Sequence, residues 1–92
     1  MDAVDRVKIL ESIEGLTRAE LADMTGLKKT KWDNYLQRKQ RLYHEDLELL
    51  ADNFPEYRNW LLTGLEMPGE GHISPMTKEA HAASKTALVA DR

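Results

Sequence analysis

The chain has 92 residues, of which 41% are hydrophobic and 32% are charged, and it contains no cysteine. This length suits one small domain, and the lack of cysteine excludes disulfides and thiolate metal sites. No run of about 18 apolar residues is present, and the charged N-terminus does not resemble a signal peptide. We therefore expect a cytoplasmic protein that does not associate with membranes.

Basic residues are concentrated in one segment, although the formal net charge of the chain is −3. Residues 28–41 contain six basic residues against one acidic residue, a local charge of +5, which leaves −8 for the rest of the chain. Salt screens charges beyond about 10 Å, so a partner responds to the local field rather than to the net charge. This asymmetry favours a polyanion bound at the basic segment.

The first expected element is an amphipathic helix over residues 3–14. Its apolar side chains recur at helical spacing, and Gly15 follows as a residue that ends the helix. We expect this helix to cover the core and to carry no chemistry of its own. Its apolar positions are Val4, Val7, Leu10 and Ile13.

Two short helices separated by a tight turn are expected next. Thr17 is a suitable N-cap for the first, and Glu20, three residues later, completes a capping box. Gly26 is the kind of C-terminal glycine that adopts a left-handed backbone and ends a helix. The second helix is expected over residues 28–36. Apolar side chains of both helices should face inward, namely Leu21, Ala22, Trp32, Tyr35 and Leu36.

The opposite face of the second helix is polar. At about 100° per residue, Thr30 and Asn34 lie roughly opposite Trp32. Short polar side chains suit contacts with base edges, and ammonium groups at the border suit contacts with phosphates. Asp33 and Gln37 lie near Thr30 and Asn34, and the ammonium groups of Lys29 and Lys31 flank them.

This pattern resembles the helix-turn-helix of the Cro and phage-repressor type, the Xre-like family. Two steeply crossing helices need a small residue at their contact, a glycine in the turn and buried anchors after it. The chain has all of these, in Ala22, Gly26, Leu27, Trp32 and Tyr35. The resemblance covers Val4 to Gly64, and it implies an all-α fold. That fold would be a compact five-helix, lambda-repressor-like domain with a short C-terminal helical tail.

The resemblance implies a sequence-specific transcriptional regulator of the repressor kind, a homodimer that reads a palindromic operator on double-stranded DNA. The helix over residues 28–36 would be the recognition helix in the major groove. The family's base-reading positions correspond to Lys29, Thr30 and Asn34, and Asp33 beside them could accept a hydrogen bond from cytosine. Phosphate contacts are expected from Arg18, where relatives often carry glutamine, and from Lys28, Lys31, Gln37, Arg38, Lys39 and Arg41.

After the basic segment, an amphipathic helix is expected over residues 42–54. Shortly before it, the family often has an Asn-Gly pair where this chain has Gln37-Arg38. The apolar stripe of the helix over residues 42–54 consists of Leu47, Leu50, Ala51 and Phe54. Its acidic residues are expected to face water or to favour the first turn, and these are Glu45, Asp46, Glu48 and Asp52.

The last helix of the domain is expected over residues 55–64, with Pro55 at its start and Gly64 at its end. Trp60 and Leu61 are interpreted as core residues. Three other residues are candidates for a dimer interface, and whether they lie at the surface is left open: Tyr57, Arg58 and Leu62.

The composition changes after Leu65. Residues 66–76 are rich in proline and glycine, which predicts a linker. Residues 77–92 are alanine-rich and predict a helical tail with Thr77 as its cap. The expected organisation is therefore a DNA-binding domain over residues 1–65, a linker, and a tail that serves dimerisation or binds a protein partner.

No arrangement of residues predicts catalysis, a metal site or a cofactor. The histidines, His44, His72 and His81, fall in different segments without ligand-like spacing, and no Gly-rich phosphate loop or catalytic triad is present. We therefore expect a protein that is not an enzyme. The alternative to a transcriptional regulator is an antitoxin or adaptor, a protein-binding module of the same fold that holds its partner through its acidic face or its tail.

Overall fold

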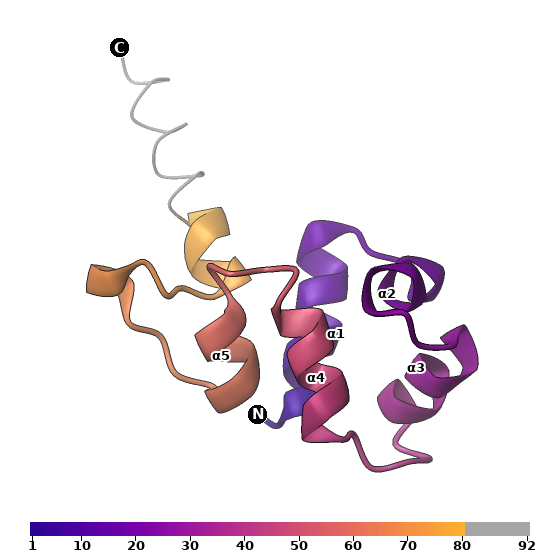
Figure 1. Cartoon of the computed structure of the whole chain (residues 1–92). Helices are drawn as coiled ribbons and strands as arrows, with labels where there is room; N and C mark the ends of the chain where they lie inside the picture. The colour runs from indigo at the N-terminus through magenta and orange to yellow at the C-terminus, as the bar shows by residue number, and fades with distance from the viewer. Residues whose placement is uncertain (81–92) are drawn as a thin grey trace.

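The computed structural model describes residues 1–80, and helices dominate them. No strand forms in this range, and the only bridge between extended residues joins Met67 and His72. The predicted all-α fold with five α-helices is confirmed (Figure 1). These helices are α1 (Ala3–Glu14), α2 (Arg18–Thr25), α3 (Lys29–Leu36), α4 (His44–Ala51) and α5 (Arg58–Thr63). A 3-10 turn, η1 (Pro68–Glu70), follows, and residues 75–80 are helical.

The helix ends around the predicted motif are stabilised by local hydrogen bonds. The backbone N of Glu20 donates to Thr17 Oγ1, and the backbone N of Thr17 donates to Glu20 Oε1, each at 3.1 Å, so the predicted capping box is confirmed. Gly26 ends α2 with a φ of 73°, in the left-handed region that favours glycine. A second capping box, between Asp2 and Asp5, begins α1. α2 therefore begins and ends as expected, and α3 ends at Leu36 as expected but begins at Lys29, one residue later than predicted.

The apolar face of α3 holds this helix in the fold. Trp32, Tyr35 and Leu36 are buried, and α3 packs against α1 and α2. The single N–H of the Trp32 indole donates to Thr25 Oγ1 at 3.0 Å, so no polar atom of this ring is left unpaired in the core. α4 packs on α2 and α5, and α5 packs on α1 (Figure 1). The core consists of Val4, Val7, Leu10, Leu21, Trp32, Tyr35, Leu36, Leu47, Leu50, Ala51, Tyr57, Trp60 and Leu61.

Helices α4 and α5 are shorter than predicted. α4 begins at His44 rather than Leu42, because Tyr43 is still extended, with a ψ of 137°. α5 begins at Arg58, because residues 55–57 form a turn before it. Gly64 ends α5 in the left-handed conformation, as predicted.

Asp46 is buried, so the expectation that it faces water is wrong, although it does lie in the first turn of α4, as the other expectation has it. It lies four residues before Leu50 and therefore on the inner face of α4. Its carboxylate accepts a hydrogen bond from the Tyr35 hydroxyl and forms an ion pair with Lys31 Nζ at 2.8 Å. These contacts tie α4 to α3.

The three candidate interface residues have different surroundings. Tyr57 is fully buried, and its hydroxyl donates to Glu14 Oε1 at 2.8 Å, so this residue belongs to the core and is not available to a partner. Arg58 is exposed and pairs with Asp52 Oδ1 at 2.9 Å, and Leu62 is half-buried. The dimer interface itself stays a prediction.

The segment predicted as a linker contacts the domain. The backbone N of Ile73 donates to the carbonyl oxygen of Glu56 at 2.9 Å, and the Ile73 side chain packs against the core. Lys78 Nζ, just beyond this segment, forms an ion pair with Glu56 Oε1 at 2.9 Å. These contacts hold residues 73–78 against the turn that precedes α5. The division into domain, linker and tail stays a prediction.

The helix at residues 75–80 begins differently from the prediction. Ser74 Oγ accepts a hydrogen bond from the backbone N of Thr77 at 3.2 Å, so Ser74 is the cap and Thr77 lies inside the helix. Glu66 Oε1 accepts from the backbone N of Ser74 at 2.7 Å. Residues 81–92, the rest of the predicted tail, lie outside the described residues.

The connector after α3 contains the only non-glycine residue with a positive φ within residues 1–80. Arg38 has a φ of 59°, at the place where the Xre-like pattern often has the glycine of its Asn-Gly pair. Its guanidinium donates to Asp2 Oδ2 at 2.6 Å and to Asp5 Oδ1 at 2.9 Å. These ion pairs hold the connector against the start of α1.

Replacing Trp32 by alanine should destabilise the domain by about 3–5 kcal/mol, because the lost volume leaves a cavity beside α2. Unfolding in urea measures this change. Trp32→Phe keeps an aromatic ring but cannot donate to Thr25, and it should lose less stability. If Trp32→Ala unfolded like the unaltered protein, Trp32 would not be part of the core.

Arg38→Gly should be more stable than Arg38→Ala by about 0.5–1 kcal/mol, because both variants lose the ion pairs but only glycine adopts a positive φ without strain. The same urea experiment compares them. Lys39 has no positive φ, so the matched pair there, Lys39→Gly and Lys39→Ala, should show the opposite order. Equal stabilities of the two Arg38 variants would argue against the left-handed conformation.

Candidate nucleic-acid interface

The exposed face of α3 carries the predicted base readers. Lys29 and Thr30 are exposed in its first turn, and Asn34, one turn after Thr30, is partly exposed. The opposite face is buried in the core, which sets the rotation of α3 about its own axis. The fold therefore brings the Thr30 hydroxyl and the Asn34 amide to one side of the molecule.

The seven predicted phosphate-binding residues fall into two groups. Four are exposed and have no ion pair or side-chain hydrogen bond with any other residue in the range 1–80, and these are Lys28, Gln37, Lys39 and Arg41. Three are held by acidic side chains, and these are Arg18, Lys31 and Arg38. Uncompensated positive charge therefore lies at the two ends of α3, just before its first turn and in the connector after its last.

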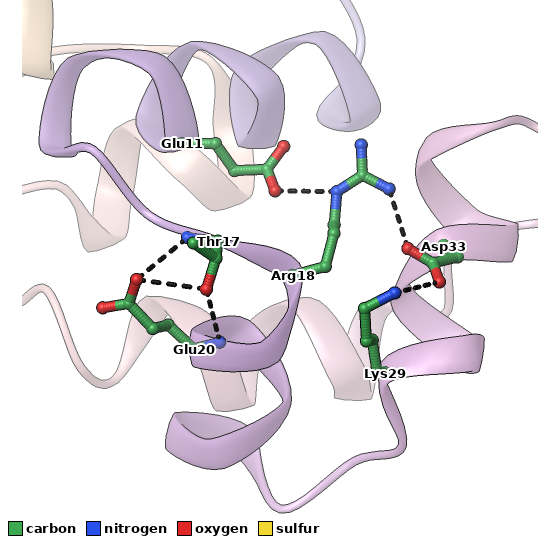
Figure 2. Close-up of polar contacts among 6 residues, drawn as sticks. All are labelled: Glu11, Thr17, Arg18, Glu20, Lys29 and Asp33. Carbon is green, nitrogen blue, oxygen red and sulfur yellow. Dashed lines mark hydrogen bonds and ion pairs between the residues drawn. The ribbon is translucent and has the colours of Figure 1, made fainter.

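Arg18 and Lys29 are joined through Asp33 (Figure 2). Asp33 Oδ1 accepts from Arg18 Nη1 at 3.1 Å, and Asp33 Oδ2 accepts from Lys29 Nζ at 2.9 Å. Arg18 Nε also donates to Glu11 Oε2 at 2.8 Å. The hydrogen bond from Lys29, with a smaller contribution from Arg18, holds the pKa of Asp33 below its usual range. This chain of ion pairs connects the first turns of α2 and α3 to α1.

Lys31 joins α3 to α4. Its Nζ pairs with Asp46 and lies 5.9 Å and 5.6 Å from the ring centres of Tyr35 and Tyr43. The hydrogen bond to Asp46 raises the pKa of Lys31. Burial raises the pKa of Tyr35 to about 12, so its phenol stays protonated and donates to Asp46. Lys31 is therefore engaged within the fold rather than projecting freely from α3.

An open hollow of about 480 Å³ lies between the start of α1 and the connector after α3. Three basic side chains of the connector, Arg38, Lys39 and Arg41, lie along it, and Asp2 is the acidic residue of its lining. The hollow continues the basic surface beyond the C-terminal end of α3.

Three charged residues have roles within the fold that were not predicted from the sequence. Glu11 and Asp46 hold basic residues, and Arg6, 8% exposed, donates from Nε to the carbonyl oxygen of Leu61 at 3.1 Å. Arg6 and Asp46 each lie four residues before a core leucine, and that spacing is the signal that places them on an inner helix face. No comparable signal marks Glu11, whose partner Arg18 belongs to the next helix.

Two kinds of feature are absent from the described part of the chain. Residues 1–80 hold no group of three histidine, cysteine, aspartate or glutamate side chains that could bind a metal ion. None of the helices in this range combines the length and the apolar character needed to cross a membrane.

Comparison with known proteins shows a likeness to a phage protein of solved structure. No protein-family model and no curated protein matches the chain. Among solved structures, Pf6r from the filamentous phage Pf6 of Pseudomonas aeruginosa PA01 is similar, with 29% sequence identity and a TM-score of 0.67. The match covers 82% of this chain and 96% of that one. The chain therefore shares its fold with a phage protein, and the Xre-like family remains a resemblance of motif.

The pair formed by Lys31 and Asp46 should make stability depend on pH. Burial acts to raise the pKa of Asp46, but the hydrogen bonds from Lys31 and Tyr35 outweigh it and hold this pKa below the ordinary value of 3.8. A carboxyl whose pKa is lower in the folded state stabilises the fold above its unfolded pKa, and this contribution is lost as pH falls through the folded pKa.

Asp46→Asn should therefore lower stability at neutral pH by about 1–3 kcal/mol, because two donors lose a charged acceptor. Melting followed by circular dichroism should show this difference shrinking as the pH falls below about 4. Asp23→Asn, at an exposed position with no side-chain hydrogen bond or ion pair among residues 1–80, is the control and should differ little from the unaltered protein. A difference of constant size down to the lowest pH would contradict the assignment.

Proposed function

We propose that this protein is a transcriptional regulator that binds double-stranded DNA in a sequence-specific way, with α3 in the major groove. The observation that carries the proposal is the outer face of α3, where Thr30 and Asn34 lie between uncompensated basic residues at the two ends of the helix. The likeness in fold to a phage protein supports it. A major groove admits an α-helix, and α3, with eight residues, is one whose outer face is polar.

The proposed contacts follow from side-chain chemistry. The Asn34 amide can donate to and accept from the edge of adenine, Lys29 can donate to guanine, and the Thr30 methyl group can contact thymine. Lys28 at the start of α3 and Lys39 after its end would contact phosphates on either side of the groove. The first group would select the sequence and the second would hold the backbone.

We further propose that the protein binds as a homodimer. One recognition helix covers only a few base pairs, too few to discriminate against a genome's competing sites. A two-fold axis would double the site and make it palindromic. On α5, Arg58 and Leu62 are accessible for this contact, whereas Tyr57 is buried. Occupying an operator in this way would suit a repressor.

Selection of bound duplexes from a random pool is the experiment that tests the function. The expected outcome is an enriched palindrome with two half-sites about one helical turn apart. Affinity for the enriched duplex should fall with salt, with a slope of roughly 0.9 for each phosphate neutralised. No enrichment together with a flat salt profile would exclude DNA binding.

Asn34→Ala and Lys39→Ala should separate base reading from phosphate binding. Asn34→Ala should relax the preference at one position in each half-site and cost about 1–3 kcal/mol on the preferred duplex, because the edge of adenine loses its partner. Lys39→Ala should weaken all duplexes about equally and reduce the salt slope by about 1. Titrations of preferred and substituted duplexes measure both effects. The assignment of roles fails if the two variants behave alike.

A further inference from the structure

Asp33 lies between two of the side chains that the proposed function assigns to DNA. Its two carboxylate oxygens are each engaged, Oδ1 by Arg18 Nη1 at 3.1 Å and Oδ2 by Lys29 Nζ at 2.9 Å (Figure 2). Arg18 begins α2 and Lys29 begins α3, so one carboxylate links the first turns of the two helices of the motif. Glu11 of α1 holds the other side of Arg18, at 2.8 Å from its Nε.

We propose that Asp33 is a positioning residue that holds Lys29 and Arg18 in fixed directions and thereby sets how well the protein discriminates its own site from other DNA. The inference rests on the proposed function and concerns the specificity of the same surface. Under it, Asp33 acts through its two basic partners instead of reading a base itself.

The ion pairs leave both cations able to contact DNA. A lysine ammonium has three donors, and Asp33 takes one from Lys29, which leaves two for the acceptors of a guanine edge. An arginine guanidinium has five N–H donors, of which Glu11 and Asp33 take two from Arg18. The pairing therefore restricts the direction of each side chain without removing its capacity to bind.

Charge balance explains why the pairing would favour specific over non-specific binding. Two cations, Arg18 and Lys29, face two anions, Glu11 and Asp33, so the cluster adds no net charge that attracts phosphates. Non-specific binding is driven by attraction between basic side chains and phosphates, which does not depend on sequence. In this protein, Lys28, Lys39 and Arg41 would supply that attraction. A base edge placed where Lys29 already points still gains a hydrogen bond. Removing the Asp33 charge would leave the cluster with a charge of +1 and a lysine free to seek any phosphate.

The test compares Asp33→Asn with Asp23→Asn, since each variant removes one negative charge. Asp23 is exposed on α2, and its side chain has no hydrogen bond or ion pair with another residue of the described chain. Affinities are measured over a range of salt for the duplex enriched from the random pool, for its single base-pair variants and for a scrambled duplex of equal length. Melting followed by circular dichroism checks that both variants are folded.

Asp33→Asn should raise affinity for the scrambled duplex by about threefold to tenfold and steepen its salt slope by roughly 1, because a released cation neutralises a further phosphate. Affinity for the enriched duplex should rise less or fall, so the ratio of the two affinities drops. Asp23→Asn should change both duplexes equally. In a Lys29→Gln background, the effect of Asp33→Asn should be smaller, since one of its two partners is already gone.

The outcomes separate this inference from the proposed function. If the unaltered protein fails to prefer any duplex, the proposed function itself is wrong. If it discriminates but Asp33→Asn behaves like Asp23→Asn, only the role of Asp33 is overturned. A loss of preference at one base pair, with the scrambled duplex unaffected, would make Asp33 a direct reader and also overturn the inference.

A measurement on free protein tests the role of Asp33 even if Asp33→Asn does not fold. The carboxyl carbon of Asp33 can be titrated by nuclear magnetic resonance in the unaltered protein and in Lys29→Gln. The pKa of Asp33 should be below its usual range in the first and should rise in the second, because Lys29 is the main cause of its lowering. Equal titration midpoints would show that Lys29 is not held by Asp33 and would overturn the inference.

Discussion

The buried face of α3 is the contact on which the rest of the arrangement depends. Trp32, Tyr35 and Leu36 are withdrawn from water where α3 packs against α1 and α2, and burial of such side chains is the dominant favourable contribution to folding. Only one rotation of a helix about its axis can bury all three at once. The outward direction of Thr30 and Asn34 is therefore a consequence of core packing, and any change that lets α3 rotate alters the outer surface as well.

Ion pairs determine how much of the basic segment's charge remains free. Three of its six basic side chains are held by carboxylates, which come from the start of α1, from α3 itself and from α4. The acidic remainder of the chain thus does more than repel polyanions at a distance, since part of it fixes cations in place. Close to the outer face of α3, basic side chains are therefore held in fixed directions by carboxylates. At the two ends of this helix, basic side chains have no acidic partner among the described residues.

Much of this arrangement follows from signals that act over three or four residues. The Thr17–Glu20 capping box, the left-handed turn at Gly26 and the burial of Trp32 were all predictable from spacing, because helix ends and helix faces are local features. The exposure of Thr30 follows from the same periodicity. Asp46 shows where a compositional rule fails, since its place on the inner face of α4 outweighs the preference of a carboxylate for water.

By itself, the sequence determined where the helices of the motif begin and end, which of their faces are buried and where positive charge is concentrated. Only the tertiary structure decided which side chains pair with one another across separate helices. Arg38 pairs with Asp2 across 36 positions of the chain, and the Tyr57 hydroxyl donates to Glu14 across 43. Such pairs depend on how separate helices pack and on a left-handed backbone at Arg38. The spacing of residues along the chain encodes neither this packing nor this backbone conformation. The distance between residues on different helices is set by the core that lies between them.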